Sequence, residues 1–259
     1  MQGNEPLSIP RRFITKESNI YGFVIKIEND INTFYDIISI LKNYNINITG
    51  IVGNLIENDI SKTSFFLILD FIKSNINYKD FLELIKKQKG VIFANILERP
   101  SKDIIVDTYH YPLIVSKKRR TYMFSEDLVT SMIKGIIDRF GKEIGQTVLF
   151  YIGKEFGKGI VEMFDEYNLG EETPLAIFYS GQANGLWKGT INLDKNKSRF
   201  YLKFEDNFEC RANRSSEIKS SLVRGMWETI MSKFYGEEIK MDETKCIAAG
   251  DEFCELKII

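Results

Sequence analysis

The order of apolar segments in residues 18–98 constrains the fold more than any other feature of this sequence. Strand-like segments occupy 20–27, 46–57, 63–71 and 91–97, and helix-like apolar spacing occurs over 33–44 and 78–88. The helical positions are Phe34, Ile37, Ile38 and Leu41 in the first helix and Phe81, Leu82 and Ile85 in the second. This βαββαβ order predicts an α+β, ferredoxin-like unit: an antiparallel sheet with both helices on one face.

The same layout resembles ACT and ACT-like regulatory domains over residues 18–98. In that family the first strand-to-helix loop, here residues 28–32, commonly helps to form an amino-acid site at a dimer interface. The resemblance therefore implies a homodimer. The glycine that is usual in this loop is missing, and Asn29, Asp30 and Asn32 are also suited to capping the helix that follows.

Proline and polar residues divide the chain into segments. Residues 1–17 contain Pro6, Pro10 and two adjacent arginines, which is typical of a flexible or docked tail. Residues 99–108 begin Arg-Pro-Ser-Lys-Asp and suggest a linker between two domains. The second domain is then expected over residues 109–259.

Residues 109–259 predict helices packed on an antiparallel sheet. Apolar spacing indicates helices over 126–140, 143–167 and 217–235, strands over 186–193 and 200–209, and a final hairpin over 239–258. The second helix contains Gly145, Gly153, Gly157 and Gly159. Each glycine costs a helix about 1 kcal/mol relative to alanine, so we expect another helix to approach this one closely.

The final hairpin carries the most specific motif of the chain. Glu243, Cys246, Gly250 and Cys254 follow a helix that contains Arg224-Gly225-Met226. These residues resemble the C-terminal signature of the 4-vinyl reductase domain family, and weaker similarity extends over residues 109–259. The family includes phenol-sensing transcription activators and, more distantly, vesicle-tethering subunits with an acyl pocket. The resemblance implies a cavity for a hydrophobic ligand.

The resemblance also implies a metal site. In the phenol-sensing members, zinc is bound by a cysteine from the helix and by Glu, Cys and Cys from the hairpin, and Glu243, Cys246 and Cys254 match the last three. The fourth position falls on Ser220, and serine is a poor zinc ligand. Cys210, which we place on a strand, and water are the other candidates. Two reduced, buried cysteines or a disulfide between Cys246 and Cys254 are alternatives to zinc.

The loop of the hairpin decides whether its two cysteines can meet. An odd loop centred on Gly250 places Cys246 and Cys254 opposite each other on one face. A two-residue loop at Gly250 and Asp251 shifts the register and places the two side chains on opposite faces. We expect Glu243, Cys246 and Cys254 to converge on one point.

Composition limits the possible partners and location. Lys and Arg total 35 against 36 Asp and Glu, so the net charge of −1 provides no basic field for binding nucleic acid directly. No apolar run approaches the length of a membrane span, and the N-terminus does not have the pattern of a secretory signal. Three cysteines are too few for a disulfide framework, so we expect a cytoplasmic protein.

We expect a ligand-sensing protein rather than an enzyme. His110 is the only histidine, and no motif pairs it with a nucleophile. We predict that His110, Tyr151, Trp187 and Trp227 line a pocket for a small hydrophobic or aromatic ligand. Since no DNA-binding or ATPase segment is recognisable, the signal would pass to a protein partner or through a change of oligomeric state. The alternatives are an enzyme or accessory of tetrapyrrole vinyl reduction, and a tethering or scaffold subunit that holds an acyl chain.

Overall fold

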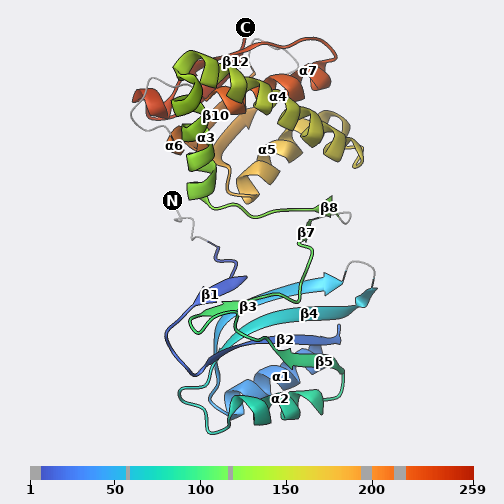
Figure 1. The fold of residues 1–259 in the computed structure, drawn as a ribbon. Helices are drawn as coiled ribbons and strands as arrows, with labels where there is room; N and C mark the ends of the chain where they lie inside the picture. Colours follow the sequence, from blue (N-terminus) through green and yellow to red (C-terminus); the bar gives the residue numbers. More distant parts are fainter. Residues whose placement is uncertain (1–6, 57–58, 116–118, 194–199, 213–219) are drawn as a thin grey trace. The chain divides into compact units, whose positions relative to one another are not determined.

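The chain folds into two compact units. The computed structural model describes residues 7–56, 59–115, 119–193, 200–212 and 220–259 (Figure 1). Unit 1 comprises Met1–Tyr122 and unit 2 comprises Met123–Ile259. Each unit has a hydrophobic core of its own, and we describe each unit by itself.

Unit 1 is built on a four-stranded antiparallel sheet with the order β3-β4-β2-β5. Its elements are β2 (Ile20–Glu28), α1 (Ile31–Asn43), β3 (Asn47–Ile56), β4 (Asp59–Asp70), α2 (Tyr78–Lys86) and β5 (Val91–Ile96). Both helices cover the same face of the sheet (Figure 1), where Phe23, Leu69 and Phe81 are buried. The ferredoxin-like arrangement expected from the sequence is confirmed. The side chain of Asp30 caps α1 by accepting a hydrogen bond from the backbone N–H of Asn32.

The other face of this sheet is covered by a ribbon of two short strands. β1 (Arg12–Ile14) pairs with β6 (Ile104–Val106), and Ile105 packs with Phe66 and Ile68 in a small buried cluster. Parts of the N-terminal tail and of the stretch 99–108 therefore belong to unit 1. Burial of Ile105 provides the driving force for this docking. A second ribbon, β7 (Ile114–Val115) with β8 (Arg119–Arg120), follows.

Unit 2 combines helices with a four-stranded antiparallel sheet of order β11-β12-β10-β9. Its helices are α3 (Glu126–Phe140), α4 (Lys142–Asp165), α5 (Thr173–Ala183), α6 (Phe208–Ala212) and α7 (Ser221–Tyr235), with short 3₁₀ turns at Gly170–Glu172 and Ile247–Ala249. The strands are β9 (Trp187–Asn192), β10 (Tyr201–Asn207), β11 (Met241–Lys245) and β12 (Cys254–Ile258). The class expected from the sequence is confirmed, although α5 and α6 were not expected.

Two of the four glycines in α4 have the role expected of them. A Cβ atom on Gly153 would lie 2.0 Å from the carbonyl oxygen of Leu222, and one on Gly157 would lie 2.6 Å from that of Met226, both in α7. Gly225 of α7 is as close to the carbonyl oxygen of Phe150. A Cβ on Gly159, in contrast, would meet nothing within 4 Å. Helices α4 and α7 thus approach each other through their glycines.

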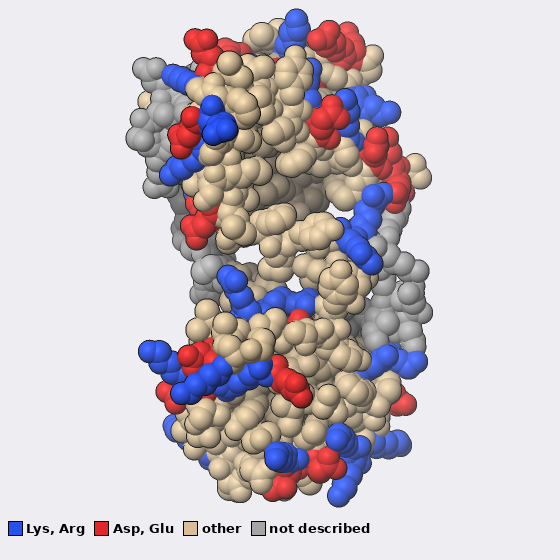
Figure 2. All heavy atoms as spheres, viewed as in Figure 1, with Lys and Arg blue, Asp and Glu red and all other residues tan. Residues whose placement is uncertain are grey.

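The surface agrees with the balanced composition. Figure 2 shows Lys and Arg interspersed with Asp and Glu on the visible face of each unit. Among the described residues, no helix has both the length and the apolar character that a membrane span requires.

Candidate functional site

Three cysteines and one glutamate of unit 2 form a buried cluster. One side-chain ligand atom from each of Cys210, Glu243, Cys246 and Cys254 lies within 4.8 Å of the others. All four residues are buried, and the three cysteines are free thiols. The convergence of Glu243, Cys246 and Cys254 that the sequence predicts is therefore present, and Cys210 completes the group.

The final hairpin brings three of these residues together. The β11–β12 ladder shifts between Glu243 and Lys245, after which Lys245 pairs with Glu255 in the register of a loop centred on Gly250. Cys246 lies just beyond the last pair, and the backbone N–H of Cys246 donates to the Asp251 carboxylate at 2.8 Å. The odd-loop alternative thus describes the end of the ladder, with a bulge that the sequence does not predict.

The fourth member comes from a helix and not from a strand. Cys210 lies on α6, directly after β10, so the prediction of a strand at this position was wrong. Strand β10 ends at Asn207, whose side chain accepts a hydrogen bond from the backbone N–H of Glu209 and turns the chain into the helix. The Cys210 sulfur lies 3.2 Å from that of Cys254 and 3.6 Å from that of Cys246.

Ser220 supports Glu243 instead of completing the cluster itself. The backbone N–H of Ser220 donates to Glu243 Oε2 at 2.8 Å, and the Ser220 hydroxyl donates to Oε1. Burial raises the pKa of Glu243 to about 8, although the bonds from Ser220 act in the opposite direction. The position where the family places a helical cysteine therefore orients a neighbouring carboxylate.

The three thiols polarise one another. Hydrogen bonds with Cys210 and Cys254 lower the pKa of Cys246, whereas hydrogen bonds with Cys246 and Cys254 raise the pKa of Cys210. Cys254 also accepts a hydrogen bond from the backbone N–H of Ile247 at 3.3 Å. A thiolate-rich set with one carboxylate is the kind of donor set that zinc accepts in tetrahedral sites.

Beside this cluster, Glu209 ties α6 to α7. Its fully buried carboxylate accepts hydrogen bonds from the backbone N–H groups of Leu222 and Val223, both at 2.9 Å. Burial raises the pKa of Glu209 to about 7, and the bonds from the start of α7 limit the rise. This contact holds the helix that carries Cys210 against α7.

The core of unit 2 is aromatic. The ring centroids of Trp187 and Trp227 lie 6.1 Å apart, with Phe178 and Phe204 packed close by. The indole N–H of Trp187 donates to the carbonyl oxygen of Phe178 at 3.0 Å. The indole nitrogen of Trp227 is buried, and no described residue serves as its hydrogen-bond partner. A buried donor without a partner is uncommon in folded proteins.

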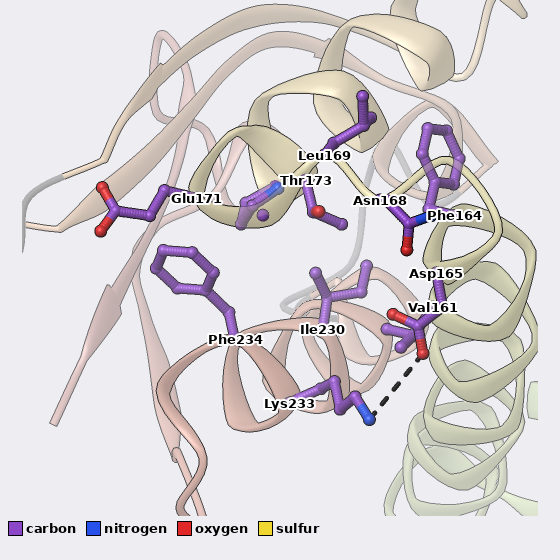
Figure 3. A pocket seen from close by; sticks show the side chains of 12 residues that line it. Val161, Phe164, Asp165, Asn168, Leu169, Glu171, Thr173, Ile230, Lys233 and Phe234 are labelled. Atoms are coloured by element: carbon purple, nitrogen blue, oxygen red, sulfur yellow. Dashed lines mark ion pairs between the residues drawn. The ribbon is translucent and has the colours of Figure 1, made fainter.

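A groove opens on this core between α4, α5 and α7. It has a volume of about 540 Å³. Figure 3 shows the side chains that line it, and Phe164, Ile230 and Val161 also belong to the core that contains both tryptophans. An ion pair between Lys233 and Asp165, 3.8 Å apart, lies at the groove. The other lining residues are Asn168, Leu169, Gly170, Glu171, Thr173, Pro174 and Phe234.

The four residues expected to bind ligand are not brought together in one place by the described contacts. Trp187 and Trp227 are buried in the core of unit 2, and neither lines the groove. Tyr151 is exposed on α4 and lines a second hollow of about 490 Å³ with Phe150 and Arg224. His110 belongs to unit 1, where its ring bonds to Ser64 and Asp107.

The groove residues escaped prediction because they lack a motif. Val161, Phe164 and Ile230 have ordinary helical spacing, and the segment around Thr173 did not suggest a helix. Only the approach of α5 to α4 and α7 creates the groove. The cluster could be found because Cys246 and Cys254 lie within one hairpin.

Comparison with known proteins gives one family match. Residues 200–259 match the model of the 4-vinyl reductase domain. No curated protein matches the chain.

Three solved structures have weak overall similarity to the chain. The phenol-responsive sensory domain of the transcription activator PoxR, solved with phenol, has 16% identity over 54% of this chain and 77% of its own, with a TM-score of 0.46. A trafficking protein particle complex subunit 3 from Naegleria fowleri, covalently bound to palmitic acid, has 13% identity over 52% and 95%, with a TM-score of 0.40. The ACT domain from GTP pyrophosphokinase of Chlorobium tepidum has 18% identity over 30% and 96%, with a TM-score of 0.25.

The family match falls on the segment that carries the buried cluster. Residues 200–259 include β10, α6, α7 and the final hairpin, and thus Cys210, Glu243, Cys246 and Cys254. This is the segment whose motif resembles the 4-vinyl reductase family in sequence. The chain therefore contains a 4-vinyl reductase domain, matched over residues 200–259.

Proposed function

We propose that this chain is a ligand-sensing regulatory protein that binds a small hydrophobic or aromatic molecule in unit 2. Binding would rearrange the units or the oligomer and so signal to a protein partner. The observation that carries the proposal is the buried indole N–H of Trp227, which no described residue accepts, inside an aromatic core that borders an open groove. The family match supports the same role. In this proposal unit 2 binds and does not catalyse.

The arrangement favours a ligand with an apolar body and one hydrogen-bond acceptor. A groove of about 540 Å³ is within the usual size range for small-molecule sites. Aromatic rings would pack against an apolar ligand, and an acceptor atom would satisfy Trp227. Trp187 would contribute its ring only, because its N–H already donates to Phe178.

Phenol and toluene, which differ by a hydroxyl, test this proposal. We expect phenol to raise the melting temperature of the full chain more than toluene does, since a ligand that binds only the folded state stabilises it. Trp227→Phe keeps a ring but removes the N–H, and should reduce the preference for phenol about five- to tenfold in calorimetric titrations. Trp187→Phe is the matched control: it should lower stability without changing the preference.

Failure of every compound in a panel of phenols, fatty acids and amino acids to shift the melting temperature would refute the sensor proposal. Native mass spectrometry separates the rivals, because a scaffold subunit would retain an acyl chain through purification. A tetrapyrrole reductase or its accessory would instead bind the tetrapyrrole.

We propose, secondly, that Cys210, Glu243, Cys246 and Cys254 hold a structural zinc ion. The fit is supported by four buried ligand atoms within 4.8 Å of one another and by a donor set of three sulfurs and one oxygen. Four protein ligands leave no open position for a substrate, so zinc would cross-link α6 to the final hairpin and take no part in catalysis.

Elemental analysis of protein purified without chelator tests the zinc site. We expect about one zinc per chain in the wild type, a substoichiometric content in Cys210→Ser and Cys246→Ser, and an unchanged content in the control Glu255→Gln. Glu255 lies beside Cys254 but its carboxylate bonds to Thr244 and Lys257. A wild-type protein without zinc would leave the cysteines as reduced core residues.

We propose, finally, that the protein works in the cytoplasm as a homodimer. Three free, buried thiols suit a reducing compartment. The ferredoxin-like sheet of unit 1 ends at β3 and β5, and edge strands of this kind are available for pairing with a second copy.

A further inference from the structure

Three side chains of unit 1 are hydrogen-bonded in a row on the sheet face that α1 and α2 leave open. Ser64 Oγ lies 2.7 Å from His110 Nε2, and His110 Nδ1 lies 2.9 Å from Asp107 Oδ2. Ser64 is on β4, and its neighbour Phe66 on the same face packs against Ile105 of β6. The row therefore joins the middle of the sheet to the segment that follows β6.

The charge of Asp107 fixes the direction of these bonds. Burial raises the pKa of Asp107, but hydrogen bonds from His110 and the nearby charge of Arg11 outweigh it and hold the pKa below its usual value. Arg11 Nε lies 3.2 Å from Asp107 Oδ2. An ionised carboxylate only accepts, so Nδ1 of His110 carries a proton. Nε2 of the neutral ring is then an acceptor that faces the hydroxyl of Ser64.

The ring of His110 is also held in place. Asp107 Oδ1 accepts hydrogen bonds from the backbone N–H groups of Tyr109 at 3.2 Å and of His110 at 3.0 Å. The carboxylate of Asp107 is 1% exposed, whereas the ring of His110 is 16% exposed. A buried carboxylate, a fixed imidazole and a serine hydroxyl in this sequence of bonds form the arrangement that activates a serine nucleophile.

The neighbours of Ser64 suit an ester with an aromatic part. Lys26 on β2 pairs with Ser64 on one side and with Phe93 of β5 on the other, so all three side chains project from the same face. Phe93 stacks on Tyr109 with ring centroids 5.3 Å apart, and both rings are partly exposed. The Lys26 ammonium provides positive charge near the nucleophile, and the stacked rings provide an apolar wall.

We propose that unit 1 hydrolyses small aryl or acyl carboxylic esters, with Ser64 as nucleophile, His110 as general base and Asp107 as a positioning residue. Ser64 Oγ bonds to the ester carbonyl carbon while its proton passes to Nε2 of His110. Nε2 then protonates the leaving oxygen as the carbon–oxygen bond breaks, which leaves an acyl-serine and an alcohol. Water, deprotonated by Nε2, cleaves the acyl-serine to a carboxylic acid and restores Ser64.

The same hydrogen bonds fasten residues 107–110 to the sheet, so the test must separate chemistry from stability. The full chain is incubated with a fluorophosphonate, which bonds covalently to an activated serine with loss of fluoride, and the site is located by peptide mass mapping. Hydrolysis of 4-nitrophenyl acetate is measured on the same samples. Circular dichroism reports whether each variant is folded.

We expect one adduct on Ser64 and ester hydrolysis in the wild type. Ser64→Ala should lose both, and the control Ser61→Ala, on the opposite face of β4, should lose neither. His110→Ala should slow labelling about 10²- to 10⁴-fold, the range for a general base. Asp107→Asn should slow labelling at least tenfold and change its pH profile, which a purely structural role would leave unaltered.

Absence of an adduct on Ser64 in the folded wild type overturns the proposal, and so does an equal labelling rate in a folded His110→Ala variant. If that variant is unfolded, the wild-type pH profile decides. A rate that rises and then levels off as an imidazole loses its proton supports the proposal, whereas a rate that continues to rise with hydroxide concentration overturns it.

Discussion

At the residue scale, the three buried carboxylates discussed above are all compensated. Asp107 has Arg11 and His110, Glu209 has the first N–H groups of α7, and Glu243 has Ser220. Taking a charge out of water is costly unless charge or hydrogen bonds replace the lost hydration. Each of these contacts joins segments distant in sequence, so the carboxylates fix tertiary structure as well as local charge.

Asp107→Asn should destabilise unit 1 by about 1–3 kcal/mol at neutral pH, because it leaves Arg11 and His110 without their anionic partner. A carboxyl group whose pKa is lowered by folding stabilises the fold above its unfolded pKa, about 3.9. That contribution is lost as the pH falls through the still lower pKa of folded Asp107. The wild type and the variant should therefore converge in acid. Chemical denaturation at several pH values measures the difference.

The exposed Asp36→Asn serves as the control for this measurement. A constant gap between wild type and Asp107→Asn down to the acid limit would contradict the assignment of the effect to charge.

Ser64 and His110 illustrate what residue types alone do not reveal. They are 46 positions apart, and neither stands in a motif. Their contact depends on β6 docking against the sheet face that carries Ser64, which is a tertiary event. Cys246 and Cys254 could be paired from the sequence because one hairpin contains both, whereas Cys210 joins them only through the turn from β10 into α6.

At the element scale, the crossing of α4 and α7 depends on glycine. Gly153→Ala and Gly225→Ala should each destabilise unit 2 by more than about 1 kcal/mol, since the added Cβ would lie 2.0–2.1 Å from a backbone carbonyl oxygen of the facing helix. Gly159→Ala is the matched control in α4, with open space around it. It should stabilise the helix by up to about 1 kcal/mol. Thermal unfolding followed by circular dichroism distinguishes the two signs. Equal effects at the three positions would exclude packing as the cause.

The predictability of elements follows from their periodicity. Helix α2 has Phe81, Leu82 and Ile85 on one buried face, so its pattern is clear. Helix α5 contains Ile177, Phe178 and Gly181, buried on several sides, and lacks a polar face that would mark it as amphipathic. Gly181 lies where the ring of Trp187 packs against the helix, and in the sequence this glycine suggests a turn. Helix α6 is too short to show a period.

At the scale of the whole molecule, oligomeric state is the first quantity to measure. Light scattering at micromolar concentration should give twice the chain mass of 30.0 kDa, because the ACT-like sheet has two edge strands suited to pairing. Charged substitutions on the exposed residues Ile48 and Ile51 of β3 should weaken the dimer if this edge forms the interface. A mass of 30.0 kDa across the concentration range would contradict the prediction.

The packing of Trp187 against Trp227 gives the protein an internal optical reporter. These are the only two tryptophans of the chain, and both lie in the core of unit 2. Light absorbed selectively by indole is therefore emitted from unit 2 alone, while unit 1 remains dark at that excitation. Quenching or a spectral shift on adding a compound would locate an event in unit 2 without any label, and far-ultraviolet circular dichroism would follow both units together.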